Sequence, residues 1–319
     1  MTRPANVFAG PYVDRSAHLR KNRAWLEAAI ADAGALVVPV WRGKHLVEQT
    51  PDRLSAALLC RETLGTFELE SAEPIYLGQF RDHSCFAIEI GTDTPPRPTA
   101  AADYRDLRLL GGALPADEAG LLAYARGMVL WRGRHRYCGT CGAPTRSDSA
   151  GHVMICTNPD CGAQHFPRVD PAIIVLVADE TDERALLGRQ ASWPAGRYST
   201  IAGFVEPGES LEDAVAREVF EETGTAVRDV RYHSSQPWPF PSSLMLGFEA
   251  RAAAQQQPRP DDELEDVCWF TRADIASGHP ALPTPTSISF RLIEDWYGRG
   301  ASRPLRDEPG ARLWDLKRR

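Results

Sequence analysis

Three glutamates in the second half of the chain are the residues best suited to do chemistry. Glu218, Glu221 and Glu222 are spaced i, i+3 and i+4, so a helix would carry their carboxylates on one face. Like charges at this spacing repel, and an isolated helix gains no stability from them. A divalent cation held by oxygen ligands reverses the sign of that interaction. The spacing therefore favours a metal site, with a solvated acidic face as the alternative for such a run seen alone.

The residues around these glutamates predict where the helix begins and ends. The turn residues Pro207 and Gly208 precede Ser210, a good N-cap, and Gly224 suits the residue that ends a helix. We expect Phe220 to pack at the edge of the buried face. The apolar positions of that face are Ala214, Val215 and Val219.

Four of the seven cysteines form a second candidate site. Cys138 and Cys141 make a CxxCG knuckle, and Cys156 and Cys161 follow it. Four thiolates suit tetrahedral Zn²⁺ and leave no open coordination position, so the ion would be structural. An iron–sulfur cluster and a site without metal are alternatives. A nucleic-acid-binding ribbon is another, because four arginines lie nearby: Arg132, Arg134, Arg136 and Arg146.

The remaining cysteines, Cys60, Cys85 and Cys268, stand alone and are expected to be small buried or half-buried residues. A cysteine cluster in a chain without a secretory signal predicts metal binding in a reducing compartment, which we take to be the cytoplasm. The longest apolar run, 172–178, is far shorter than the roughly 20 residues of a membrane helix. No membrane association is expected.

Composition predicts an ordinary globular protein. The chain has 319 residues, of which 43% are hydrophobic and 25% charged, which excludes disordered and fibrous classes and allows about two domains. Its net charge of −7 disfavours general nucleic-acid binding, because phosphate contacts need clustered cations. A phosphorylated substrate would therefore need positive charge from another source, and a metal ion is the obvious candidate.

Local patterns predict the elements that position these sites. A helix at 17–33 and strands at 35–41 and 85–90 are expected in the first third of the chain. A proline-rich linker at 92–98 precedes a helix at 116–131 that begins near Pro115 and Asp117. Strands and helices resume from 171 to 297, and the tail after 298 is expected to be irregular or frayed.

The acidic segment resembles the Nudix box, G-x5-E-x7-R-E-U-x-E-E-x-G-U. Only the last position departs, because Thr225 stands where the family has an aliphatic residue. The resemblance implies an α/β/α sandwich with a mixed sheet, in which Glu218, Glu221 and Glu222 hold Mg²⁺ or Mn²⁺. It implies that Arg217 and Glu209 brace the box, although Glu209 could join the metal ligands. The positions that match are Gly203, Glu209, Arg217, Glu218, Val219, Glu221, Glu222 and Gly224.

A proline-rich run eleven residues after Gly224 bears on the substrate. Residues 235–243 read SQPWPFPSS, and the alternating prolines predict a stiff, extended segment that carries Trp238 and Phe240. On composition alone, a surface polyproline ligand or a packed loop fits as well as a pocket for an aromatic ring. The run is also similar to the SQPWPFPxS motif of the NADH pyrophosphatases, the NudC-type branch of the Nudix hydrolases.

That resemblance implies a domain order. A divergent N-terminal α+β domain would span 1–130, a four-cysteine zinc ribbon 131–167 and the Nudix hydrolase domain 168–319. It covers 120–297 strongly and the N-terminal part only in layout. It further implies metal contacts from the Ala202 backbone and from Glu263, and one structural zinc per chain. The substrate contacts that it implies are Phe166, Gln236, Pro237, Trp238, Pro239, Phe240, Pro241, Ser242, Ser243 and Ser289.

The reaction implied is metal-dependent hydrolysis of NADH or NAD⁺ to nicotinamide mononucleotide and AMP. One box glutamate would take the proton of the attacking water, and Glu218 is the first choice. The same site could remove 5′ NAD caps from RNA, and the resemblance also implies a homodimer. A Nudix-fold sensor or a zinc-ribbon nucleic-acid binder without catalysis is the rival from another class. The intact set of box glutamates argues against it.

Overall fold

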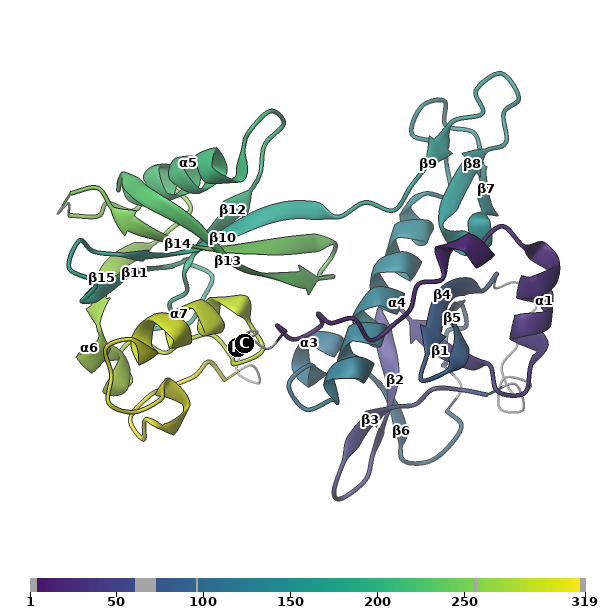
Figure 1. Ribbon diagram of the computed structural model, residues 1–319, viewed down its shortest axis with the longest axis horizontal. Helices are drawn as coiled ribbons and strands as arrows, with labels where there is room; N and C mark the ends of the chain where they lie inside the picture. Colours follow the sequence, from purple (N-terminus) through teal and green to yellow (C-terminus); the bar gives the residue numbers. More distant parts are fainter. Residues whose placement is uncertain (1–4, 61–72, 96, 255–256, 316–319) are drawn as a thin grey trace. The chain divides into compact units, whose positions relative to one another are not determined.

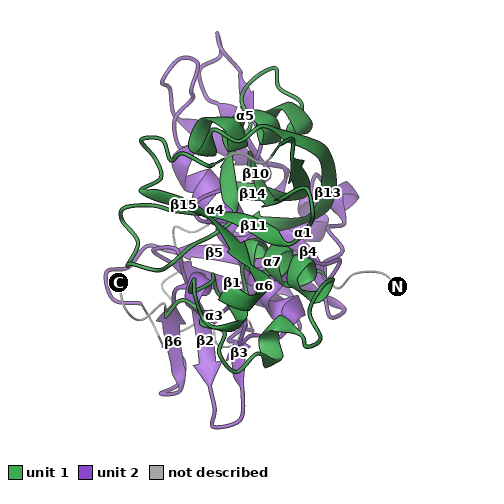
Figure 2. Cartoon of the chain, turned by 90° about the vertical axis from the view of Figure 1, so that its left-hand side faces the viewer, with its two compact units in different colours: residues 1–6, 170–237, 243–319 green, residues 7–169, 238–242 purple. Residues whose placement is uncertain are grey.

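Two compact units make up the chain (Figure 2). The computed structural model describes residues 5–60, 73–95, 97–254 and 257–315. Unit 1 comprises residues 1–6, 170–237 and 243–319, and unit 2 comprises residues 7–169 and 238–242. The short segment 238–242 therefore groups with unit 2, although the residues on both sides of it belong to unit 1.

Unit 1 is built on a six-stranded mixed sheet (Figure 1). The strand order is β13-β14-β10-β11-β15, and β12 pairs with β10. The pair β10–β14 is parallel, whereas β10–β11, β10–β12 and β11–β15 are antiparallel. The strands are β10 (Asp170–Ala178), β11 (Arg184–Arg189), β12 (Ile201–Phe204), β13 (Val227–Trp238), β14 (Ser243–Ala252) and β15 (Asp266–Thr271).

The central strand β10 shows why this sheet is covered on both faces. Ile173, Val175 and Val177 pack in the core that includes the apolar face of α5 (Leu211–Thr223). The alternate residues Ile174, Leu176 and Ala178 pack in a second core with α7 (Ile288–Gly298). Successive side chains of a strand point to opposite faces, so an unbroken apolar run needs two covering layers. The expected α/β/α sandwich is confirmed, with α6 (Arg272–Ala276) and the 3₁₀ turn η3 (Leu305–Asp307) completing the second layer.

Unit 2 contains a second six-stranded sheet, ordered β3-β2-β1-β5-β4 with β6 paired to β2. Its central pair β1–β5 is parallel and its other pairs are antiparallel. The predicted strands at 35–41 and 85–90 are confirmed as β1 and β5. The strands are β1 (Leu36–Trp41), β2 (Lys44–Gln49), β3 (Leu54–Ala56), β4 (Ile75–Phe80), β5 (His83–Ile90) and β6 (Ala102–Arg105).

Helices cover both faces of this sheet as well. The long α4 (Ala116–Arg134) packs with Val38, Val40 and Ala87 on one face, and α1 (Arg23–Ala31) packs with Val37 and Ile88 on the other. The short helix α3 (Leu107–Leu110) precedes α4. A separate three-stranded sheet follows α4, and its strands are β7 (Thr145–Asp148), β8 (Val153–Cys156) and β9 (Gln164–His165). The 3₁₀ turn η2 (Ser149–Gly151) lies between β7 and β8.

The structure corrects three of the predicted elements. The helix expected at 17–33 is a 3₁₀ turn, η1 (Ala17–Leu19), followed by α1, because the Asn22 side chain accepts a hydrogen bond from the Trp25 N–H and caps a new helix. The tail is irregular but not frayed up to residue 315, since it pairs with Leu282 through the Arg312 carbonyl and the Trp314 N–H. The run 235–243 is extended only to Trp238; residues 239–242 form the turn between the adjacent strands β13 and β14.

Other predictions hold with small changes. The helix expected at 116–131 is α4, which runs on to Arg134 and has Pro115 at its N-cap position. The described residues of 92–98 form no helix or strand, and they lie inside unit 2. Cys85 is buried, and Cys60 and Cys268 are half-buried, as expected. Among the described residues, no helix is both long and apolar enough to cross a membrane.

Candidate active site and metal centres

Helix α5 carries the three box glutamates. It begins at a capping box, in which the Ser210 side chain accepts from the Asp213 N–H while the Asp213 carboxylate binds the Ser210 N–H. It ends at Gly224, whose φ of 66° is the left-handed conformation that glycine adopts without strain. Both ends are as predicted, and so is the buried face. Phe220 is 59% exposed instead of packed, because it lies on the side of the helix away from the sheet.

Arg217 braces the site as the resemblance implied. Its guanidinium donates to both carboxylate oxygens of Glu209, at 2.5 and 2.9 Å, and to the Phe204 carbonyl at 2.9 Å. The same group donates to Glu218 and Glu221 at 2.9 Å each. The guanidinium holds the pKa of Glu209 low, at about 2. Glu209 thus gives both of its oxygens to Arg217, whereas Glu218 and Glu221 each give one, and Glu222 gives none among the described residues.

Gly203 explains how Glu218 reaches the backbone of β12. A Cβ built on Gly203 would lie 1.9 Å from the Glu218 carboxylate carbon, so no other residue fits there unless Glu218 moves. The carboxylate therefore lies against the strand next to Ala202, whose backbone was expected to face the metal. Ala202 itself pairs with Ile174 in the β10–β12 ladder. The glycine of the box thus gives Glu218 its position.

Glu222 is the buried carboxylate without a hydrogen-bond donor. Only 5% of the residue is exposed, and among the described residues no side chain or N–H donates to it. Burial, followed by the charges of Glu218 and Glu263, raises the pKa of Glu222 to about 8. Burial also raises the pKa of Glu218, against the opposing effect of Arg217. The charge of Glu263 contributes to the raised pKa of both groups, and its role as a metal ligand stays a prediction.

This cluster fits a divalent cation. Glu222 is buried and Glu218 half-buried, whereas Glu221 and Glu263 are exposed. Buried carboxylates near one another repel unless a cation or a proton neutralises them. Arg217 pairs with Glu218 and Glu221, and Glu222 and Glu263 have no such partner among the described residues. Oxygen ligands of this kind suit hard cations such as Mg²⁺ and Mn²⁺. The oxygen chemistry of these glutamates therefore suits such a metal, but among the described residues only the four cysteines have ligand atoms close enough together to form a metal group.

Two predicted substrate contacts in unit 1 are buried and satisfied internally. Gln236 is 1% exposed; its amide nitrogen donates to the Thr286 carbonyl at 2.8 Å and its oxygen accepts from the Ile288 N–H at 2.9 Å. The Ser289 hydroxyl lies 2.8 Å from the hydroxyls of both Ser199 and Thr200. These hydrogen bonds connect β13, and the residues just before β12, to the start of α7. Both residues are placed to hold the site's frame, and their contact with substrate stays a prediction.

The predicted aromatic contacts belong to unit 2. Phe166 is 48% exposed beyond β9, and Trp238 and Phe240 lie in the segment 238–242. The two rings of that segment meet edge to face at 5.0 Å. Ser243 begins β14 of unit 1, opposite Asp170. Ring contacts by Phe166, Trp238 and Phe240 stay predictions, as do contacts by the remaining residues of the run: Pro237, Pro239, Pro241, Ser242 and Ser243.

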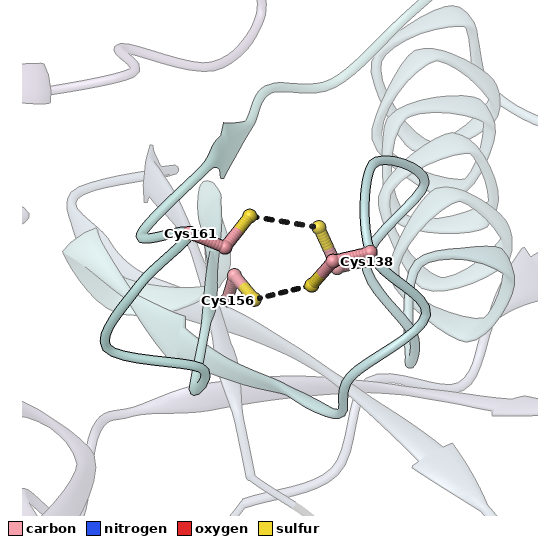
Figure 3. A group of neighbouring side chains, drawn as sticks. Cys138, Cys156 and Cys161 are labelled. Atoms are coloured by element: carbon pink, nitrogen blue, oxygen red, sulfur yellow. Dashed lines mark hydrogen bonds between the residues drawn. The ribbon is translucent and has the colours of Figure 1, made fainter.

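The four cysteines of the knuckles come together in unit 2 (Figure 3). Their Sγ atoms all lie within 4.8 Å of one another; Cys138 and Cys161 are 3.9 Å apart and Cys141 and Cys156 are 3.4 Å apart. Four sulfurs at about 2.3 Å from a tetrahedral Zn²⁺ would be about 3.8 Å apart. The cluster therefore fits zinc. The backbone N–H groups of Thr140 and Cys141 lower the pKa of Cys138 to about 5, which favours the thiolate that a metal binds.

His165 is a neighbour of this cluster that the sequence reasoning missed. Its Nε2 lies 3.3 Å from the Cys138 sulfur. Its position four residues after Cys161 was the available signal. A ring N–H donated to the thiolate would orient Cys138 and lower its charge density, as outer partners of metal ligands do.

Comparison with known proteins places this geometry in a family. Sequence models of three domain families match: an NADH pyrophosphatase-like rudimentary NUDIX domain at 34–131, an NADH pyrophosphatase zinc ribbon domain at 134–166 and a NUDIX domain at 168–290. A relative from Stutzerimonas stutzeri, named NAD-capped RNA hydrolase NudC, is 39% identical over 295 residues, which cover 89% of this chain and 98% of that protein. The chain belongs to the NADH pyrophosphatase branch of the Nudix hydrolases.

Other members of the branch show the same similarity over shorter spans. A NudC of the same description from Mycobacterium bovis is 39% identical over 238 residues, covering 70% of this chain and 75% of the relative. NUDT12 of Macaca fascicularis, also named an NAD-capped RNA hydrolase, is 40% identical over 196 residues, covering 57% of this chain and 42% of the relative. This chain is thus a Nudix hydrolase with all the glutamates of the box, a zinc ribbon and a rudimentary second Nudix domain.

The departure from the Nudix box at Thr225 is accommodated within unit 1. The residue is fully buried, its N–H donates to the Thr223 hydroxyl at 3.2 Å, and its own hydroxyl reaches the Thr223 carbonyl at 3.5 Å. The polar group is therefore bonded locally at a packing position. It touches none of the box glutamates.

Proposed function

We propose that this Nudix hydrolase splits the diphosphate of NADH and NAD⁺ into nicotinamide mononucleotide and AMP. The observation that carries the proposal is Glu222: a buried carboxylate without a donor, beside Glu218 and Glu263, in a protein whose relatives are named for action on NAD-capped RNA. Water adds to one phosphorus, the bridging P–O bond breaks, and one proton is released. Both products are monophosphates.

The chain's residues divide this work. Glu218, Glu221, Glu222, Glu263 and the Ala202 carbonyl form the binding site for Mg²⁺ or Mn²⁺. A bound ion supplies charge neutralisation of the diphosphate and a lowered pKa for water. Glu218 accepts the proton of the attacking water, because it lies against β12 and its second partner, Arg217, fixes its orientation.

Binding of the dinucleotide is assigned to the run 236–243, Phe166 and Ser289. Trp238, Phe240 and Phe166 present rings that can stack on the bases at low entropic cost, since aromatic side chains have few rotatable bonds. The buried hydrogen bonds of Gln236 hold the backbone just before Trp238, and those of Ser289 hold the residues just before β12. The specificity of the site for a dinucleotide follows from these rings.

A second substrate, RNA with a 5′-terminal NAD cap, is supported by the names of the relatives. The reaction at the diphosphate is the same. In this substrate the RNA chain is attached to the AMP part, in place of a hydroxyl hydrogen. We also propose a cytoplasmic location, supported by the lack of a disulfide among the described residues. The family resemblance supports a homodimer with one structural zinc per chain.

The test is product formation by pure protein. NADH with Mg²⁺ or Mn²⁺ should yield AMP, and NAD-capped RNA should yield 5′-monophosphate RNA, whereas triphosphate RNA should be left intact. Glu222→Gln should abolish most turnover. Glu212→Gln, on an exposed position of the first turn of α5, is the matched control and should behave as the parent. A parent that binds NADH without forming AMP would instead indicate a non-catalytic sensor.

A further inference from the structure

The turn that carries the predicted ring-binding residues is held by the N-terminal region of the chain. Residues 238–242 group with unit 2, and Trp238 and Phe240 pack against the core that α4 forms with the six-stranded sheet of unit 2. Phe8 lies 6.1 Å from the Trp238 ring and 5.9 Å from the Phe240 ring, measured between centroids. The rings that would meet a substrate are therefore seated on unit 2.

Arg126 of α4 makes the polar part of this attachment. Its Nε donates to the Pro239 carbonyl at 2.7 Å, and its Nη1 donates to the carbonyl of Gly43, in the turn between β1 and β2. The same guanidinium lies over the Phe240 ring, 5.0 Å from its centroid. One planar group thus joins two backbone segments and supports an aromatic ring.

The surroundings of Arg126 argue against an ordinary ion-pair role. No carboxylate lies within salt-bridge distance of it among the described residues, and the residue is half-buried. Burying a guanidinium is costly unless its donors are used, and here the donors serve carbonyls and a ring. A lysine could supply the charge, but not the fork that reaches both carbonyls nor the planar face.

We infer that Arg126 is a positioning residue that fixes the Trp238–Phe240 turn for substrate, so that the rudimentary Nudix domain acts as the support of the specificity segment. The inference rests on the proposed function for its kinetic consequence only. Proline already restricts the turn, and Arg126 removes the remaining freedom before substrate arrives. Preorganisation of this kind strengthens binding and leaves the chemical step unchanged.

The experiment compares three variants of the full chain. Arg126→Ala removes the attachment, and Arg126→Lys keeps the charge alone. Arg132→Ala is the matched control, because Arg132 lies in the same helix and also donates to a backbone carbonyl, that of Glu73, without touching the turn. Hydrogen exchange of the Trp238, Phe240, Ser242 and Ser243 amides reports the turn directly, and NADH kinetics at saturating metal report its consequence.

We expect faster exchange of these amides in Arg126→Ala, with KM for NADH raised on the order of tenfold and kcat within about threefold of the parent. Arg126→Lys should be intermediate between the parent and Arg126→Ala in both amide exchange and KM. If Arg126→Ala is insoluble, Arg126→Lys alone is compared with the parent. Arg132→Ala should match the parent in exchange and in KM.

Two results separate this inference from the proposed function. Unchanged exchange at the turn in both Arg126 variants overturns the inference, whatever the substrate is. Faster exchange with unchanged KM for NADH overturns the link between the turn and substrate. A parent without NADH hydrolysis would refute the proposed function, and the exchange data would still decide whether Arg126 holds the turn.

Discussion

The two units each bury a glutamate, and the two carboxylates differ in what surrounds them. Glu118, in α4 of unit 2, is 2% exposed; it accepts from Arg53 at 3.0 Å, from Arg81 at 2.9 Å and from the Ala56 N–H at 2.7 Å. Glu222, in α5 of unit 1, is 5% exposed and has no donor among the described residues. Both lie on helices that cover a six-stranded sheet with a parallel central pair.

The difference separates a structural carboxylate from one built for chemistry. Burial alone is compatible with either role, since a buried charge is tolerated when hydrogen bonds satisfy it. Hydrogen bonds from its own unit satisfy the Glu118 carboxylate, so it needs no further partner. Glu222 is surrounded by other carboxylates, so its neutralisation must come from a proton or a cation. The unit that retains an unsatisfied carboxylate is the one that retains the Nudix box.

The largest effect is expected in unit 1. Glu222→Gln and Glu218→Gln should each lower kcat for NADH by about 10²–10³, as the loss of one preorganised charged group does elsewhere. The amide keeps the shape of the side chain, so the fold should persist in circular dichroism. Turnover near that of the parent at saturating Mn²⁺ in both variants would refute the assignment of the box.

The second effect concerns the metal site of unit 2. Cys141→Ser should remove one zinc ligand and lower the free energy of unfolding by at least about 2 kcal/mol, because structural zinc contributes folding energy. The melting temperature and zinc content should both fall, and folded protein should keep its KM for NADH. Loss of catalysis in a well-folded variant that has lost its zinc would contradict a purely structural site.

Glu118→Gln tests the satisfied carboxylate. The amide cannot pair with Arg53 and Arg81, so the free energy of unfolding should drop by about 1–3 kcal/mol; both arginines are half exposed and regain water. Urea denaturation measures the change. NADH turnover at 25 °C should stay within about twofold, and a large loss of kcat would break the distinction between the two glutamates.

The pH dependence of metal binding tests the unsatisfied carboxylate. The pKa of Glu222 is about 8 in the metal-free fold, above its ordinary value of 4.5, so metal must displace a proton below pH 8. Apparent affinity for Mn²⁺ should rise about tenfold per pH unit up to pH 8 and then level off. The free energy of unfolding of the metal-free protein should fall as the pH rises from 4.5 to 8. Titration calorimetry at several pH values would show the slope, and Glu222→Gln should flatten it.

The smallest effect is expected at Thr225. Its hydroxyl makes only a 3.5 Å contact with the Thr223 carbonyl, which also accepts from the Arg259 N–H at 2.9 Å. Thr225→Val therefore leaves no acceptor unsatisfied and should raise the free energy of unfolding by up to about 1 kcal/mol. Thermal unfolding would register the shift; a clear loss of stability would show that the hydroxyl matters.

Particular residues show how far the sequence could be followed. The ends of α5, its buried face and the Arg217–Glu209 brace were predictable, because caps, periodicity and box spacing act within a few turns of chain. The buried state of Gln236 and Ser289 was not, since their partners are fifty and ninety residues away. Phe220 shows the same limit, because exposure depends on which helix face meets the sheet.

The sequence by itself determined the chemistry available to this protein: four thiolates for zinc, glutamates for a hard divalent cation, and a proline-rich run with two aromatic rings. Local spacing is enough for that, because ligand sets and helix caps are short-range features. Only the tertiary structure decided that Glu222 has no donor among the described residues, that Gly203 admits Glu218 against β12, and that Arg126 holds the Pro239 carbonyl from 113 residues away. Burial and satisfaction of a polar group depend on packing between distant segments, which no local pattern encodes.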